Sequence, residues 1–306
     1  MNLLHVDLVS LRLLVFAAET LNLTQAANRA NMTLSTASKR LTELERITEC
    51  ALFVRLPRGV ELTAAGRGIV DHARHILDSV NRMACDANDF AMGVRGNVRL
   101  TVNTSAVVQF LPQDLAMYLA NNPFVRIGME EALSDDIVAA VHDGRADIGI
   151  FADNVASYEL VKRVYRRDQL VLLVPVKHPL ADCHELALVE ALDHDFVALN
   201  QGSSLLRRLT DAAVANGKML KVRIQVSSFD GICRMIEAGL GIGVLPLASV
   251  RKELLGTQLV AIPLSDAWAR RTLYVGVSNE ALLSPEAAKL FDYLARMEHA
   301  GDEPDK

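Results

Sequence analysis

Two short helical patterns separated by a tight polar turn lie within residues 24–62, and this stretch constrains the fold more than any other part of the chain. The first pattern carries Ala26, Ala27 and Ala30, small residues that allow a second helix to cross closely. The turn follows at Asn31, and Asn tolerates the left-handed backbone that such turns require. The sequence therefore predicts a helix-turn-helix near the N-terminus.

The second helix is predicted to begin after Thr33, whose hydroxyl can accept a hydrogen bond from a free amide at the helix start. Leu34, Ala37, Leu41 and Leu44 recur at spacings of three and four, so we expect them to share one buried face. The other faces carry hydroxyls and two cations, which suit base edges and phosphates in a major groove. The DNA contacts predicted for this helix and its cap are Thr33, Ser35, Thr36, Ser38, Lys39, Arg40 and Thr42.

A short hairpin is predicted after the second helix. Residues 54–56 and 60–62 have strand character and flank a Pro-Arg-Gly turn. We expect Arg55 and Arg58 to contact phosphates or the minor groove beside the recognition helix. An ordinary amphipathic helix pair with a solvated polar face is the alternative for residues 24–62. The hairpin favours DNA binding, because the packing of a protein core does not require arginines in such a hairpin.

The distribution of charge supports a local role in DNA binding. The chain of 306 residues has a formal net charge of −5, so its overall field does not attract polyanions. Residues 24–59 contain six Lys and Arg residues against three Glu residues, a net charge of +3. Binding to nucleic acid is therefore expected only near the N-terminus.

Composition and cysteine spacing exclude several other classes of protein. With 51% hydrophobic and 23% charged residues, the chain is globular, and it is long enough for two or three domains. The four cysteines lack metal-site spacing, so we expect no metal and no other cofactor. They are most simply reduced thiols of a cytoplasmic protein, with a redox sensor formed by Cys183 and Cys233 as the alternative.

The apolar stretch at residues 8–18 is predicted to be the first helix of the DNA-binding domain. Its apolar residues have helical spacing, and Asp7 and Arg12 make it unlike an export signal. No apolar run elsewhere approaches the ~20 residues that a membrane span requires. We therefore expect no membrane partner.

A long helix is predicted after Thr63. Its apolar positions alternate spacings of four and three, while the opposite positions are polar, which is typical of a two-stranded coiled coil. We expect this helix to join two copies of the chain; the alternative is a helix buried in a core. Gly93 and Gly96 are expected to end the helix and to form a hinge. The apolar positions are Ile69, Ala73, Ile76, Val80, Met83, Ala87 and Phe90.

The rest of the chain alternates predicted strands and helices. Strands at 98–102, 124–131 and 146–151, with helices at 111–121 and 134–142, form a βαβαβ unit and imply a parallel sheet. A second such unit begins at Gln169, and a strand at 273–277 and a helix at 285–297 close the chain. We expect an α/β fold with a DNA-binding domain at 1–62, a linker helix at 63–92 and a two-lobed domain at 93–300. Lobe I is expected at about 97–166 and 269–297, and lobe II at about 167–268.

Two α/β lobes place a ligand cleft beyond the carboxyl ends of their strands. Helices beginning at Ser105, Ser134 and Ser203 would direct free amides into it, which suits a small organic acid. Each serine alone could simply cap its helix, but the convergence of several favours a ligand site. The predicted ligand residues are Asn103, Thr104, Ser105, Leu133, Ser134, Gln201, Ser203, Ser204, Ser227 and Ser228.

Over nearly its whole length the chain resembles the LysR-type transcriptional regulators. The resemblance rests on motifs that include T-L-S-T-A-S-K-R-L-x-x-L-E, L-F-V-R-L-P-R-G-V-x-L-T-A-A-G and V-S-S-F-D-G-I-C-R-M-I-E-A-G-L-G-I-G-V-L-P. It implies a winged helix-turn-helix, a dimerising linker helix and a periplasmic-binding-protein-like effector domain. It also implies promoter DNA, a small-molecule effector and RNA polymerase as partners, and a homodimer that assembles into a homotetramer.

The resemblance also assigns residues. The family's groove contacts fall on Ser35, Thr36, Ser38 and Lys39, with Arg55 or Arg58 in the wing, and its effector contacts fall on Asn103, Ser105, Ser134, Ser203 and Ser227. The family often has Gln at Leu34 and Pro at Ser35, so we expect a different base preference. No Arg is evident at the effector positions, which leaves the charge of the effector open.

The sequence leaves two other functions as alternatives to a regulator. An enzyme is not expected, because His142, His178 and His194 are scattered and the G-L-G-I-G-V segment follows a helix, unlike a dinucleotide-binding fingerprint. A small-molecule binding protein without a DNA role is the main alternative. It is disfavoured by the DNA-binding pattern and by the lack of an export signal.

Overall fold

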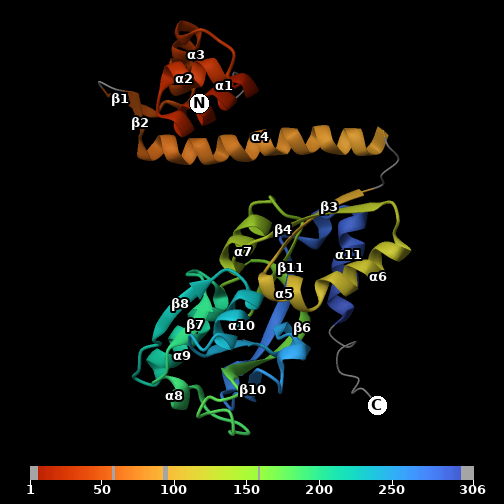
Figure 1. Cartoon of the computed structure of the whole chain (residues 1–306). Coiled ribbons are helices and arrows are strands. Elements are labelled where there is room, and N and C mark those ends of the chain that lie inside the picture. The colour runs from red at the N-terminus through yellow and green to blue at the C-terminus, as the bar shows by residue number, and fades with distance from the viewer. Residues whose placement is uncertain (1–5, 57–58, 92–95, 158, 298–306) are drawn as a thin grey trace. The chain divides into compact units, whose positions relative to one another are not determined.

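The computed structural model describes residues 6–56, 59–91, 96–157 and 159–297, and its chain divides into two compact units, Met1–Met92 and Gly93–Lys306 (Figure 1). In the first unit, helices pack around a small core and a two-stranded hairpin adjoins them. Leu13, Leu14 and Leu52 are fully buried there, and Ala26 and Ala27 are buried as well. The elements are α1 (Leu8–Thr20), α2 (Leu23–Arg29), α3 (Leu34–Thr48), β1 (Phe53–Leu56), β2 (Gly59–Leu62) and α4 (Ala64–Ala91).

The turn between α2 and α3 has the predicted geometry. Asn31 has a positive φ of 52°, and Thr33 caps α3 by accepting a hydrogen bond from the amide of Thr36. The prediction that Leu34 is buried is wrong, because its side chain is 48% exposed. The buried face of α3 begins one turn later, at Ala37, and extends to Ile47. Leu34 instead borders a surface hollow together with Thr24 and Val60.

Helix α4 packs against α1 over its first turns. Val70 and Ala73 belong to the core of the N-terminal unit, so Ala73 is not available for the expected seam between two copies. Further along, Ile76 is 45% exposed and Met83 is 66% exposed. The side chains of Ala87 and Phe90, also expected in the seam, lie outside the described residues.

In the second unit, a seven-stranded sheet runs in the order β10-β6-β11-β5-β3-β4, with β9 paired to β6. The strands β3, β4 and β5 are parallel, as predicted for the first βαβαβ unit. Helices α5, α6, α7 and α11 belong to the same lobe as these parallel strands. The elements are β3 (Gly96–Val102), α5 (Thr104–Gln109), α6 (Leu111–Asn121), β4 (Val125–Glu131), α7 (Ser134–His142), β5 (Ile148–Ala152), β11 (Arg270–Val277) and α11 (Pro285–Arg296).

The second lobe departs from the predicted parallel unit. Strand β6 (Val161–Pro175) begins before the predicted strand at 170 and pairs antiparallel with β9 (Gly243–Pro246), β10 (Leu259–Pro263) and β11. The first half of β6, residues 161–168, contains five charged residues, so its sequence lacks the apolar run that predicts a buried strand. Among the described strands of this lobe, β7 and β8 form a parallel pair. The remaining elements are α8 (Leu188–Ala191), β7 (Phe196–Leu199), α9 (Ser204–Ala215), β8 (Val222–Val226), α10 (Phe229–Glu237) and short 3-10 turns.

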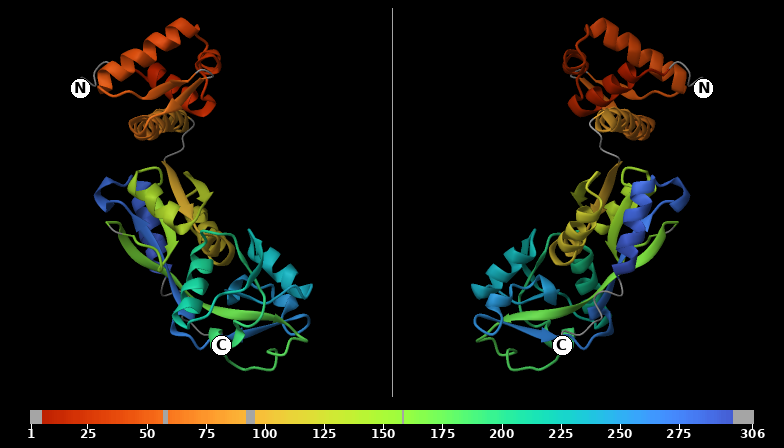
Figure 2. Two further views of the ribbon diagram at one scale, coloured as in Figure 1. Left: turned by 90° about the vertical axis from the view of Figure 1, so that its left-hand side faces the viewer. Right: turned by 90° about the vertical axis from the view of Figure 1, so that its right-hand side faces the viewer.

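Strands β6 and β11 join the two lobes. One core lies around Val98, Tyr165 and Phe291, and the other around Leu172, Phe196 and Phe229. Figure 2 shows the lobes from two sides, one mainly yellow and dark blue, the other green to light blue. None of the described helices combines the length and hydrophobicity that a membrane crossing needs.

Candidate nucleic-acid interface and ligand cleft

Helix α3 has one apolar and one polar face. Ala37, Leu41 and Leu44 are buried against the other helices, which directs the intervening residues outward. The exposed members of the predicted contact set on this helix and its cap are Thr33, Ser35, Thr36, Lys39 and Thr42, whereas Ser38 and Arg40 are half-buried. The helix therefore offers a row of hydroxyls and a cation to a partner.

The hydroxyls at the start of α3 are linked to one another. Thr33 Oγ1 lies 3.0 Å from Ser35 Oγ and 2.9 Å from Thr36 Oγ1. Thr33 is thus occupied as a cap, while Ser35 and Thr36 retain capacity for a further hydrogen bond.

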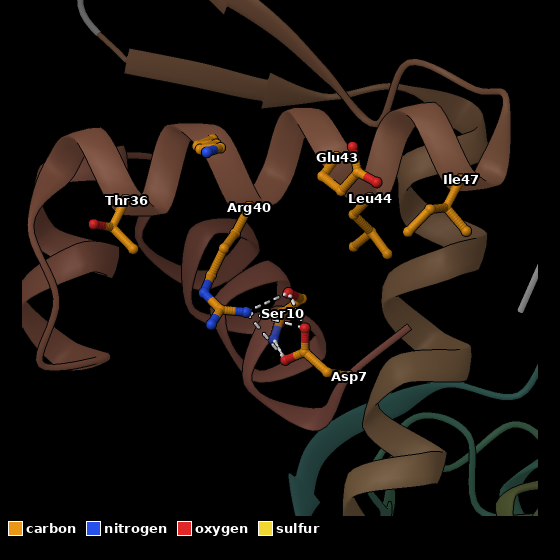
Figure 3. A pocket seen from close by; sticks show the side chains of 8 residues that line it. Asp7, Ser10, Thr36, Arg40, Glu43, Leu44 and Ile47 are labelled. Atoms are coloured by element: carbon orange, nitrogen blue, oxygen red, sulfur yellow. Dashed lines mark hydrogen bonds and ion pairs between the residues drawn. The ribbon is translucent and has the colours of Figure 1, made fainter. Parts of the chain in front are cut away.

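Arg40 bends away from the exposed face toward α1 (Figure 3). Its Nη1 donates to Asp7 Oδ2 at 3.0 Å and to Ser10 Oγ at 3.2 Å, beside a hollow of about 420 Å³. Partial burial opposes ionisation of Asp7, but hydrogen bonds from Ser10 and the charge of Arg40 hold the pKa of this carboxyl below its ordinary value. The charge of Arg40 is therefore partly neutralised.

Lys39 differs from the other cations of α3. Arg40 pairs with Asp7 and Arg46 pairs with Glu43, whereas within the described residues no carboxylate forms an ion pair with Lys39. Lys39 is thus the cation of this helix best placed to neutralise a phosphate. In the wing, β1 and β2 pair as a hairpin, but Arg58 and the side chain of Arg55 lie outside the described residues.

The second candidate site is a cleft between the lobes, at the carboxyl ends of β3, β4 and β7. It contains a hollow of about 440 Å³ and an adjoining one of about 30 Å³. The predicted residues that line them are Asn103, Thr104, Ser105, Leu133, Ser134, Ser203, Ser204 and Ser227. Gln201 and Ser228 are not among the lining residues.

Several lining residues had not been predicted: Glu131, Ala132, Leu199, Asn200 and Leu205. Most lie at the end of a strand or directly after one. Glu131, for example, ends β4 and pairs in register with Val102, directly before the predicted residues Asn103 and Thr104. Glu131 is the last residue of the strand predicted at 124–131, but the prediction took the residues that follow each strand and so omitted this carboxylate.

Many of the predicted polar side chains also have structural partners. Asn103 Oδ1 accepts from the amide of Ala106 at 3.0 Å, and Ser203 Oγ accepts from the amide of Leu206 at 3.2 Å, so both cap helices. Ser228 caps α10 in the same way, and Ser134 Oγ accepts from the amide of Ala152. A serine hydroxyl that accepts one hydrogen bond can still donate one to a ligand.

A buried arginine that the sequence did not reveal lies beneath the cleft. Arg271 of β11 is 2% exposed, and its Nη2 donates to Ser105 Oγ at 3.0 Å. It also pairs with Asp168 of β6, which accepts a further hydrogen bond from Gln109 Nε2 at 3.0 Å. Because Asp168 neutralises Arg271, this arginine supports the cleft floor without presenting a free charge.

The first turns of α9 connect the two lobes beside the cleft. Arg207 pairs with Asp135, and Arg208 pairs with Asp153. Asn154 Nδ2 also donates to the carbonyl of Ser204 at 2.8 Å. The lobes are therefore in direct contact along one side of the cleft.

Both parts of the chain match known protein families. Residues 8–67 match the bacterial regulatory helix-turn-helix proteins of the lysR family, and residues 91–298 match the LysR substrate binding domain. The chain belongs to the LysR family. This confirms the resemblance seen in the sequence and assigns the two candidate sites to a DNA-binding domain and an effector-binding domain of a transcriptional regulator.

Curated members of the LysR family are similar to the chain over most of their length. The HTH-type transcriptional regulator CitR of Bacillus subtilis is 26% identical over 296 residues, covering 94% of this chain and 98% of CitR. The RuBisCO operon transcriptional regulator of Allochromatium vinosum is 24% identical over 292 residues, covering 95% and 96%. These relatives are transcriptional regulators.

Solved structures of LysR regulators have the same fold. The crystal structure of CbnR, a LysR family transcriptional regulator, has a TM-score of 0.73 at 16% identity and covers 95% of this chain and 99% of CbnR. The Synechocystis PCC6803 CcmR regulatory domain, in complex with 2-PG, has a TM-score of 0.61 at 21% identity and covers 67% of this chain and 98% of that domain. These likenesses confirm an α/β effector domain behind a helix-turn-helix.

Proposed function

We propose that this LysR-type regulator inserts α3 into the major groove of promoter DNA. The observation that carries the proposal is the exposed polar face of α3, backed by a buried apolar one. In a homodimer, two such helices would occupy successive major grooves about 34 Å apart. The residues proposed to face the duplex are Ser35, Thr36, Ser38, Lys39 and Thr42, with Arg55 and Arg58 of the wing at the backbone or minor groove.

The effector is proposed to bind in the interlobe cleft. A ligand that contacts both lobes favours the arrangement in which its contacts are complete. The resulting shift would change how dimers associate into a tetramer, how the DNA bends, and how RNA polymerase is engaged. The protein is proposed to act in the cytoplasm, where the DNA is, and to catalyse no reaction.

Gel retardation with the intergenic DNA upstream of the gene tests the proposal. We expect sequence-selective retardation, and we expect Lys39→Ala to weaken binding and to reduce the salt slope by about one unit, because one fewer phosphate is neutralised. Arg46→Ala is the matched control, since Arg46 lies on the same helix but pairs with Glu43. A protein that only binds solutes would retard no sequence selectively.

An equal loss of slope in both variants would show that the effect is not specific to Lys39. An unchanged slope in Lys39→Ala would remove Lys39 from the contact surface. Selective retardation of undiminished strength in both variants would retain the DNA-binding function but assign the contact to other residues.

A further inference from the structure

The charge of the interlobe cleft limits the chemistry of its ligand, and this inference rests on the proposed function of the cleft as the effector site. Glu131 is the one charged side chain among the residues that line the two hollows, all of which lie in the described part of the chain. The polar remainder consists of hydroxyls and amides. Leu133, Leu199 and Ala132 supply the apolar wall.

Glu131 is held in place at the edge of the cleft. Because it pairs in register with Val102, it lies beside Thr104, whose Oγ1 donates to Glu131 Oε1 at 2.5 Å. This contact occupies one carboxylate oxygen. Glu131 is exposed, so its second oxygen can accept a hydrogen bond from a ligand.

The arginines near the cleft do not offset this negative charge. Arg207 pairs with Asp135 and Arg208 with Asp153, both at the first turns of α9. Arg271, beneath Ser105, pairs with Asp168. A small organic acid, the class expected from the helix starts, would therefore meet a carboxylate and no cationic side chain among the described residues that line the hollows.

We infer that the effector carries a protonated amine, which donates to Glu131, and an apolar body that lies against Leu133 and Leu199. The hydroxyls of Ser203 and Ser227 line the same hollow and can bind further polar groups of the ligand. The volume of this hollow, about 440 Å³, is within the usual range for small-molecule sites. Simple amines and amino acids share this ammonium group.

Matched sets of small molecules test the inference on the full-length protein. Each set contains an amino acid, the amine left by its decarboxylation and the acid left by removal of its amino group; leucine, 3-methylbutylamine and 4-methylpentanoate form one such set. We expect amine-bearing compounds of at least one set to raise the melting temperature at millimolar concentration, whereas the matched acid does not. If both the amines and the amino acids stabilise the protein, the ammonium group alone is sufficient for binding. If only the amino acids do, the ligand needs a carboxylate in addition to the ammonium group.

Substitution of the carboxylate locates the effect. Glu131→Gln keeps the size of the side chain, and we expect it to weaken binding of the stabilising compound by about tenfold or more, because the acceptor of the ammonium's hydrogen bond loses its negative charge. Glu130→Gln is the matched control, since neighbouring residues of a strand point to opposite faces. Titration calorimetry measures both affinities.

Three outcomes would overturn the inference: acids that stabilise as strongly as their matched amines, no stabilisation by any amine-bearing compound, or undiminished affinity in Glu131→Gln. Gel retardation with the same protein separates these from failure of the proposed function. If an acid binds and DNA binding persists, the cleft remains the effector site and only the ligand class is wrong. Loss of selective retardation in the wild-type protein would instead refute the regulator function.

Discussion

Arg271 carries its charge in a position that is almost fully buried, and Asp168 is its partner. Arg271→Met would leave Asp168 as a buried carboxylate that keeps, among its side-chain partners in the described residues, the hydrogen bond from Gln109 Nε2. We expect a loss of about 3–5 kcal/mol in the free energy of unfolding, because removing one partner leaves an uncompensated charge. Urea denaturation measures this loss.

The double variant Arg271→Met with Asp168→Leu is the control for this interpretation. Replacing a whole buried ion pair by apolar residues is often close to neutral. Most of the stability should therefore return. A double variant as unstable as the single one would show that Arg271 stabilises the cleft floor through packing or through Ser105, and not through its charge pair.

Leu34 is the first residue of α3 and is exposed beside the predicted DNA contacts. In a major groove, an apolar side chain contacts the thymine methyl group, whereas Gln pairs with adenine. We expect Leu34→Gln to change the preferred base at one position of the DNA site, with stability altered by no more than about 0.5 kcal/mol. Selection of bound duplexes from a random pool measures the preference.

Leu56 provides the matched control for Leu34. It is also exposed and borders the same hollow, but it lies in the wing strand β1. Leu56→Gln should leave the selected base at the α3 position unchanged. Identical selected sequences for Leu34→Gln and the wild type would place Leu34 outside the base contacts.

At the scale of elements, the described residues of α4 differ in burial along its length. Val70 and Ala73 complete the core of the DNA-binding unit, whereas Ile76 and Met83 are exposed apolar residues on the predicted seam. Ile76→Glu with Met83→Glu should convert the proposed dimer into monomers, because two positions that the dimer would bury become charged. Sedimentation equilibrium measures the change.

The substitution Asn81→Glu is the control for α4, since Asn81 lies among its exposed polar positions. We expect it to leave the assembly unchanged. A wild-type protein that is already monomeric, or a double variant that remains dimeric, would contradict dimerisation through this seam.

Most elements could be predicted from the sequence because their periodicity and caps are local properties. Thr33 caps α3 and Asn31 adopts the left-handed turn, as the residue types indicate. Strand β6 was only half recognised, since its charged first part is stabilised by partners distant in the sequence, such as Arg271 beside Asp168. Non-local pairing cannot be inferred from spacing.

The same distinction applies to the cleft. Serines at helix starts were found because capping is a local signal, and their caps at Ser203 and Ser228 are present. Arg271 was missed because its contact with Ser105 joins residues far apart in the chain. Leu34 was misplaced because periodicity identifies a face but not the point at which the core ends.

At the scale of the whole molecule, the two compact units have separate hydrophobic cores. Leu14 is fully buried in the first and Leu172 in the second. Because each cluster of buried residues in the described part of the chain belongs to one unit, we expect scanning calorimetry of the full chain to give two transitions. Leu14→Ala should lower only one of them, and Leu172→Ala only the other.

Each substitution should cost about 2–5 kcal/mol, as large-to-small changes in a core do. The melting temperature of the smaller N-terminal unit should fall by about 4–8 °C for each kcal/mol lost, and that of the larger unit by about 2–4 °C. The difference arises because the entropy of unfolding increases with the size of the unit. A single transition that both substitutions lower would show that the units unfold cooperatively. In that case the effector unit could influence DNA binding through shared stability as well as through the arrangement of its lobes.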